Sequence, residues 1–161
     1  MRGVIGLIGA IVGYYLAKDK YVFQKLYDRK LVLMADLYEQ VVRLEFELKK
    51  YVHFVGAETS TDSPENKREA LNKIKADFQK FQHKFWEVEI ILDENVIKKI
   101  EEFLAQYIQI TSKLSTANIS QQIGDSGYSF DAWNQSFELV RSNLAKVKTE
   151  LKQEFQNTLK K

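Results

Sequence analysis

The sequence predicts an all-α protein in which an N-terminal membrane-inserted helix continues into an antiparallel four-helix bundle with coiled-coil-like heptad packing. Three observations predict this class. The 161 residues include one Pro and seven Gly, too few turn residues for a protein of many short strands. From Tyr27 onward, apolar residues recur at spacings of three and four, the period of a buried helical face. Residues 3–17 carry no charge at all.

The composition also limits the chemistry of the chain. The absence of Cys excludes disulfides and cysteine-ligated zinc. The net charge is +2, and the basic residues are spread along the chain instead of being clustered. A nucleic-acid-binding surface needs a cluster of basic residues, so no nucleic-acid partner is expected.

The uncharged segment 3–17 is short for a membrane span. Fifteen helical residues measure roughly 22 Å, against a hydrocarbon core of about 30 Å. Extension to Phe23 gives roughly 31 Å if the flanking lysines reach back to the surface. The predicted interfacial anchors are Tyr14, Tyr15, Lys18, Lys20 and Tyr21.

Two alternatives to membrane insertion stay open at this stage. A cleavable signal peptide would place Tyr15 three residues before a cut at Ala17, where a small residue is preferred. A buried hydrophobic helix would carry four Gly, each costing about 1 kcal/mol in a soluble helix. The lack of a polar face argues against a helix lying on the bilayer surface.

Small residues are ordered within this segment. Gly9 and Gly13 are four residues apart, and Gly6 and Ala10 repeat that spacing one turn earlier. Such a strip lets two helix backbones approach closely in a bilayer, where packing drives association. We therefore predict self-association through a membrane-helix packing face. Its residues are Gly6, Gly9, Ala10, Gly13 and Ala17.

The flanking charges predict the orientation. Basic residues follow the segment at 18, 20, 25, 29 and 30, whereas only Arg2 and the amino terminus precede it. By the positive-inside rule the C-terminal part should be cytoplasmic. The expected location is the inner (cytoplasmic) membrane of a bacterium, crossed once.

The rest of the chain divides into predicted helices. Residues 1–23 form the membrane segment and 24–161 the bundle, with helices at about 24–55, 64–92, 94–115 and 129–159. Gly56 should end the first helix, and Asp62 or Ser63, followed by Pro64, should begin the second. Asp93 and Ser129 are the expected N-caps of the third and fourth helices, and 115–128 is the expected extended linker. A single helix over 64–115 is the alternative to a turn near Asp93.

Each predicted helix has an apolar stripe that should form the core, with Trp86 and Trp133 flanking it. The stripes are Leu37, Val41, Leu44, Leu48, Tyr51 and Val55; Leu71, Ile74, Phe78, Phe81, Phe85, Val88 and Leu92; Val96, Ile100, Phe103, Tyr107, Ile110 and Leu114; and Trp133, Phe137, Val140, Leu144, Val147, Leu151 and Phe155. Upstream, Tyr27, Leu31, Met34 and Tyr38 widen the first stripe.

No catalytic, metal-binding or cofactor-binding residue is expected. Metal sites in helical bundles use Glu-x-x-His pairs, but Lys occupies the required position before both His53 and His83, which should lie on the surface. The motif GDSG at 124–127 occurs around the nucleophile of chymotrypsin-like proteases, which are β-barrels. In an all-helical chain it is expected to be a turn.

Three functions compete. The first is a non-enzymatic, single-pass, membrane-anchored bundle that associates with itself and acts as a structural or interaction component. Its partners would be the lipid bilayer, further copies of the chain, and another protein at the bundle. The second is a membrane effector or pore-forming oligomer gated by the bundle. The third is a soluble oligomeric bundle that binds a ligand or partner.

Overall fold

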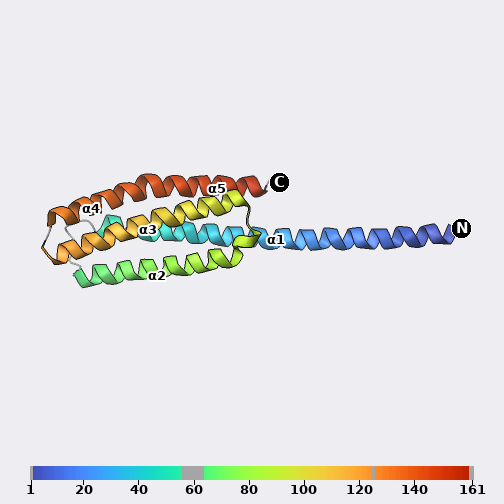
Figure 1. Ribbon diagram of the computed structural model, residues 1–161, viewed down its shortest axis with the longest axis horizontal. Coiled ribbons are helices and arrows are strands. Elements are labelled where there is room, and N and C mark those ends of the chain that lie inside the picture. Colours follow the sequence, from blue (N-terminus) through green and yellow to red (C-terminus); the bar gives the residue numbers. More distant parts are fainter. Residues whose placement is uncertain (1, 56–63, 125, 160–161) are drawn as a thin grey trace. The chain divides into compact units, whose positions relative to one another are not determined.

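The computed structural model describes the backbone of residues 2–55, 64–124 and 126–159, and the side chains of 18, 20–53, 65–124, 127 and 129–158. All described elements are helices (Figure 1). They are α1 (Arg2–Val55), α2 (Pro64–Val88), η1 (Glu89–Ile91), α3 (Glu94–Gln122), α4 (Ser126–Leu139), η2 (Val140–Leu144) and α5 (Ala145–Leu159). The prediction of an all-α bundle is therefore confirmed.

The chain separates into two compact units, Met1–Ala35 and Asp36–Lys161. The second, here called the bundle unit, contains the end of α1 and every later helix. The predicted division at residues 23 and 24 concerned the extent of a membrane segment and stays a prediction.

Contacts between side chains define an up-down-up-down bundle. From Asp36 to Tyr51, α1 meets α2 in reverse order, first Lys84 and then the carbonyl of Lys67, so these helices are antiparallel. The α2 and α3 helices are also antiparallel, because Phe81 faces Phe103 and Lys75 bonds Ser115.

The last helical segment returns antiparallel to α3. Lys113 bonds Gln135 near its start, and Lys99 bonds Glu150 near its end. Within the bundle unit, Figure 1 shows α2, α3 and the α4–α5 segment lying alongside the part of α1 that begins at Asp36. Up-down-up-down order needs only short connections between neighbouring helices.

The predicted stripes form the core. Every stripe residue whose side chain is described is buried except Val88, Trp133 and Phe137, which are half-buried. Val55 lies outside the described side chains. Aromatic rings fill the centre, where Phe78 stacks on Tyr107 with ring centroids 4.5 Å apart. Tyr27, Leu31 and Tyr38 are half-buried, and Met34 is buried.

The predicted turn near Asp93 is present. The α2 helix ends at Val88, η1 follows, and Leu92 adopts an extended conformation before α3 begins. Asp93 occupies the N-cap position, but its side chain makes no capping bond and accepts a hydrogen bond of 2.8 Å from Thr158. The predicted boundaries at Gly56, Asp62 and Ser63 lie outside the described residues.

The predicted linker over 115–128 is wrong for most of its length. The α3 helix continues to Gln122, and its last turns bury Ala117, Asn118 and Ser120 in the core. The chain reverses only at Gly124, whose φ of +85° lies in the left-handed region that favours glycine. Ser129 is likewise not a cap, because α4 already begins at Ser126. Its hydroxyl donates a hydrogen bond of 3.0 Å to the carbonyl of Ala117, which links α4 to α3.

The last helix contains a π-helical turn at Val140–Leu144. The buried residues Ala132, Ser136, Val140 and Leu144 are spaced by four, and each such step advances about 40° around an α-helix. Three steps would turn the stripe about 120° away from the core. A π-turn contains one extra residue, which takes back about 100° and keeps the stripe facing inward.

Candidate functional site

The predicted membrane-helix packing face cannot be compared with side-chain positions. Its backbone belongs to α1, but the side chains of residues 1–17 lie outside the described part of the chain. The prediction therefore stays a prediction for Gly6, Gly9, Ala10, Gly13 and Ala17, and for the anchors Tyr14 and Tyr15.

The remaining predicted anchors are described, and all three are exposed: Lys18, Lys20 and Tyr21. Large apolar side chains follow them on α1 and are exposed as well. Phe23 is 72% exposed and Val32 69%. The segment directly after residue 17 therefore presents apolar surface mixed with lysines. Among the described residues, no helix combines the length and apolar character needed to cross a membrane.

A buried carboxylate joins α1 to α5. Glu45 is 3% exposed and accepts a hydrogen bond from Lys148. The ammonium of Lys49 lies 2.9 Å from the other carboxylate oxygen, in ion-pair contact but without hydrogen-bond geometry. Two cations therefore neutralise one carboxylate that water hardly reaches. Sequence reasoning missed Glu45 because its neighbour Leu44 already supplied the apolar stripe.

A second polar contact crosses the core nearer to the C-terminal end of α1. The amide of Asn118 donates a hydrogen bond of 2.9 Å to the hydroxyl of Tyr51. That hydroxyl in turn donates a hydrogen bond of 3.2 Å to the carbonyl of Lys67. The Tyr51 ring also packs on Trp133 with centroids 5.6 Å apart. Burial raises the pKa of the Tyr51 hydroxyl, and the hydrogen bond from Asn118 opposes this rise. The contact fixes the register of three helices, and its buried, neutral groups are suited to packing.

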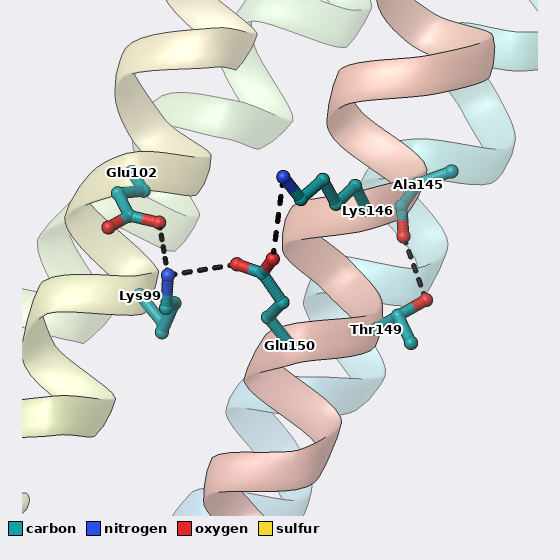
Figure 2. A network of polar contacts seen from close by, with 6 residues as sticks. All are labelled: Lys99, Glu102, Ala145, Lys146, Thr149 and Glu150. Carbon is teal, nitrogen blue, oxygen red and sulfur yellow. Dashed lines mark hydrogen bonds and ion pairs between the residues drawn. The ribbon is translucent and has the colours of Figure 1, made fainter.

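An ion network on the surface ties α3 to α5 (Figure 2). The ammonium of Lys99 lies 2.7 Å from Glu102 and 2.8 Å from Glu150, and Lys146 approaches Glu150 at 3.9 Å. Hydrogen bonds to Glu102 and Glu150 raise the pKa of Lys99 to about 12. The hydrogen bond from Lys99 lowers the pKa of Glu150. Exposed ion pairs add little stability one by one, so these contacts are weak evidence for the stability of the bundle.

Two shallow grooves open on the bundle unit. One, of about 270 Å³, lies between α1 and α2 and mixes carboxylates with Arg43 and Lys80. At its edge, a hydrogen bond from Lys84 lowers the pKa of Asp36. The other, of about 250 Å³, has an apolar floor bordered by Lys49, His53 and Arg141. Neither groove joins a nucleophile to a base, so neither provides a catalytic arrangement.

The residues with potential chemistry take structural positions. His53 and His83 are exposed, as predicted, and pack edge-on against Phe137 and Trp86. Within the described residues, no group of three His, Asp or Glu side chains could hold a metal ion. In the motif at 124–127, Gly124 lies in the turn after α3, whereas Ser126 and Gly127 already belong to α4, and Asp125 lies outside the described residues.

One predicted core residue is misplaced. Trp86 is exposed instead of flanking the core, because Phe85 already occupies the inward position at that level of α2. Two other exposed apolar side chains, Ile90 and Ile91, follow it in the sequence and belong to η1. Ile90 is 92% exposed.

Comparison with known proteins adds no assignment: no protein family, curated protein or solved structure matches the chain.

Proposed function

We propose that this chain is a non-enzymatic protein that its N-terminal segment anchors in a membrane, where it associates with further copies and acts as a structural or interaction component. The bundle unit is the part that would meet a protein partner. The basic residues after residue 17 support a cytoplasmic position for the bundle by the positive-inside rule.

The observation that carries the proposal is the apolar surface directly after the uncharged segment. Tyr21, Phe23, Leu26 and Val32 are all exposed on α1. A helix without a packed face is marginal in water, and exposed aromatic residues there lower its solubility. A bilayer interface covers such residues, because aromatic rings and lysine stems favour the headgroup region.

The bundle unit supports a role in structure or binding. Its interior is filled with aliphatic and aromatic side chains, and its buried polar groups at Glu45 and Asn118 are used to join helices. A fully packed bundle offers outer surfaces for recognition and little room for a substrate. This supports an interaction component over an enzyme.

Membrane fractionation tests the anchor. We expect the full chain to pellet with membranes and to be released by detergent but not by alkaline carbonate. Ile8→Asp places a charge inside the uncharged segment, at a cost of about 2.5–3.5 kcal/mol in membrane insertion. This variant should move to the soluble fraction. The matched control, Ile90→Asp, changes an exposed isoleucine of the bundle unit and should stay in the membrane.

Recovery of the unmodified chain in the soluble fraction without detergent would overturn the anchor and favour a soluble oligomeric bundle. Equal behaviour of Ile8→Asp and Ile90→Asp would also contradict it.

Self-association has its own test. The double change Gly9→Leu and Gly13→Leu adds side chains to the predicted packing face, which should weaken cross-linking between copies in a membrane. The control, Ile8→Leu and Val12→Leu, has the same spacing in the same segment without changing a Gly. Unchanged cross-linking of the Gly double variant would contradict the packing face. Loss of membrane potential on expression of the unmodified chain would instead favour the pore-forming alternative.

A further inference from the structure

The outer side of α3 is unusual in this charged protein. Between Phe103 and Gly124 only Lys113 carries a charge, whereas α2 has ten charged residues among 25. Lys113 does not lie free on that side, because its ammonium bonds Gln135 of α4 at 2.6 Å. The exposed side of α3 is therefore uncharged over about five turns.

The uncharged residues form a second stripe with heptad spacing, on the side away from the core. Its members are all exposed: Ala105, Gln109, Ser112, Thr116, Ile119 and Ile123. Ile119 is 59% and Ile123 76% exposed, and Ile108 beside the stripe is exposed too. Alternating steps of four and three keep a stripe facing one partner helix. We call these six residues the α3 outer stripe.

We propose that the α3 outer stripe is the surface through which the bundle units of two copies pair, with their α3 helices parallel. The parallel direction rests on the proposed function: both chains pass from Ala35 into the bundle unit at the same end, and both would start from the same membrane.

The missing charges are the reason for choosing a second copy as the partner. In a two-fold pairing of parallel helices, each residue of the stripe faces its own counterpart. A charged residue there would meet a like charge, which repels at close range. The α3 outer stripe avoids this over its whole length. A different protein partner would impose no such restriction and could match charges instead.

The small residues of the stripe fit close pairing. Ala105, Ser112 and Thr116 let the two helices approach, while the isoleucines toward Gly124 supply apolar contact. On either side of α3, the neighbouring lysines are held by their own bundle, Lys75 by Ser115 and Lys113 by Gln135. Cations therefore border the stripe without crossing it, the arrangement of an apolar centre with a polar rim.

The size of the stripe predicts a weak interface. From Ala105 to Ile123 it measures about 27 Å in length and about 10 Å in width, a footprint of roughly 270 Å². A standard stable interface buries about 800 Å² on each partner. Pairing of this kind needs help from a high local concentration, which two copies in one membrane would supply.

Cysteine cross-linking tests the inference, and the sequence has no Cys to interfere. Single variants Gln109→Cys, Ser112→Cys and Thr116→Cys are incorporated as full chains into vesicles of phosphatidylethanolamine and phosphatidylglycerol, then mildly oxidised. The control, Asn72→Cys, lies at an exposed position of α2. We expect each stripe variant to form at least tenfold more disulfide-linked dimer than the control.

The outcomes separate the possible arrangements. Strong cross-linking at only one of the three stripe positions would overturn the parallel direction, because antiparallel helices bring only one such position against itself. Yields equal to that of Asn72→Cys at all three positions would overturn the interface. A second variant, Ile119→Lys combined with Ser112→Cys, should reduce the dimer yield at least tenfold, whereas Asn72→Lys with Ser112→Cys should not.

The test also separates this inference from the proposed function. Failure of the anchor appears as protein that does not pellet with the vesicles. In that case the same oxidation is carried out in solution at high protein concentration. A higher yield of disulfide-linked dimer from the stripe variants than from Asn72→Cys would uphold the interface without the membrane. Equal yields from all variants would overturn it.

Discussion

The π-helical turn in the last helix gives the sharpest prediction about how this chain holds its register. Deleting Ser142 removes one exposed residue from the turn Val140–Leu144. The extra residue is then gone, and the segment can continue as a regular α-helix. Because the π-turn already offset the drift of the buried stripe, the residues on both sides keep facing the core.

The magnitude follows from the positions of the buried residues. After the deletion, the step from Val140 to Leu144 becomes three residues, and the stripe stays within about 120° around an α-helix. The deletion costs the hydrogen bond of 2.6 Å from the Ser142 hydroxyl to the Glu138 carbonyl, which is exposed. We expect the free energy of unfolding to change by no more than about 1 kcal/mol.

A matched deletion of Ser112 provides the contrast. Ser112 is also an exposed serine, but it lies in a regular part of α3. Its removal rotates the following residues of α3 by about 100° around the helix axis, which takes Leu114 and Ala117 out of the core. Loss of one buried leucine costs about 2.7–5 kcal/mol, so the unfolding temperature should fall by roughly 10 °C or more.

The assay is thermal and urea unfolding of both full-length variants in detergent, followed by circular dichroism. The expected order is that the Ser142 deletion stays close to the parent and the Ser112 deletion is strongly destabilised. Equal destabilisation by the two deletions would refute the interpretation of the π-turn as an extra residue that keeps the stripe in phase.

Three further predictions concern the polar contacts. Lys148→Met leaves the buried Glu45 carboxylate with one cation and should lower the free energy of unfolding in urea by about 1–3 kcal/mol, while a second change, Glu45→Met, should recover most of it. Tyr51→Phe leaves the Asn118 amide without its acceptor and should cost about 1–3 kcal/mol, a loss that Asn118→Ala should partly relieve; full additivity of the two changes would contradict the bond. The hydrogen bond from Lys99 lowers the pKa of Glu150 in the folded state. The contribution of Glu150 to the free energy of unfolding is therefore complete above the unfolded pKa of about 4.3 and is lost as the pH falls through the folded pKa. Glu150→Gln should therefore flatten the decline of stability in acid, and an unchanged slope between about pH 5 and 2 would contradict this.

The core was predictable because burial follows helical periodicity. Residues such as Leu37, Ile100 and Leu151 repeat at three and four, and the physical requirement to bury one face leaves few other positions for them. The turn near Asp93 was expected from the cap signal that follows Leu92, although apolar steps of four continue to Val96 and Ile100 and left a single helix as the alternative.

The end of α3 was not predictable by the same method. Ala117, Asn118 and Ser120 are buried, yet they are small or polar and resemble a linker in the sequence. Their burial depends on tertiary contacts, such as the bond between Asn118 and Tyr51, 67 residues apart. The uncharged outer side of α3 strengthened the impression of a linker, because surface helices normally carry charges. Trp86 shows the converse error: its size favours the core, but its position beside Phe85 places it outside.

The contact between Glu45 and Lys148 has a consequence for how the chain is made. The two residues are 103 positions apart in the sequence. A ribosome adding about 5–20 residues per second delivers Lys148 roughly 5–20 s after Glu45. During that interval the side of α1 that α5 covers in the folded protein stays exposed. The α2 and α3 helices are complete earlier and can pack against α1 first. Slower translation would lengthen the period during which this side of α1 is exposed to neighbouring chains.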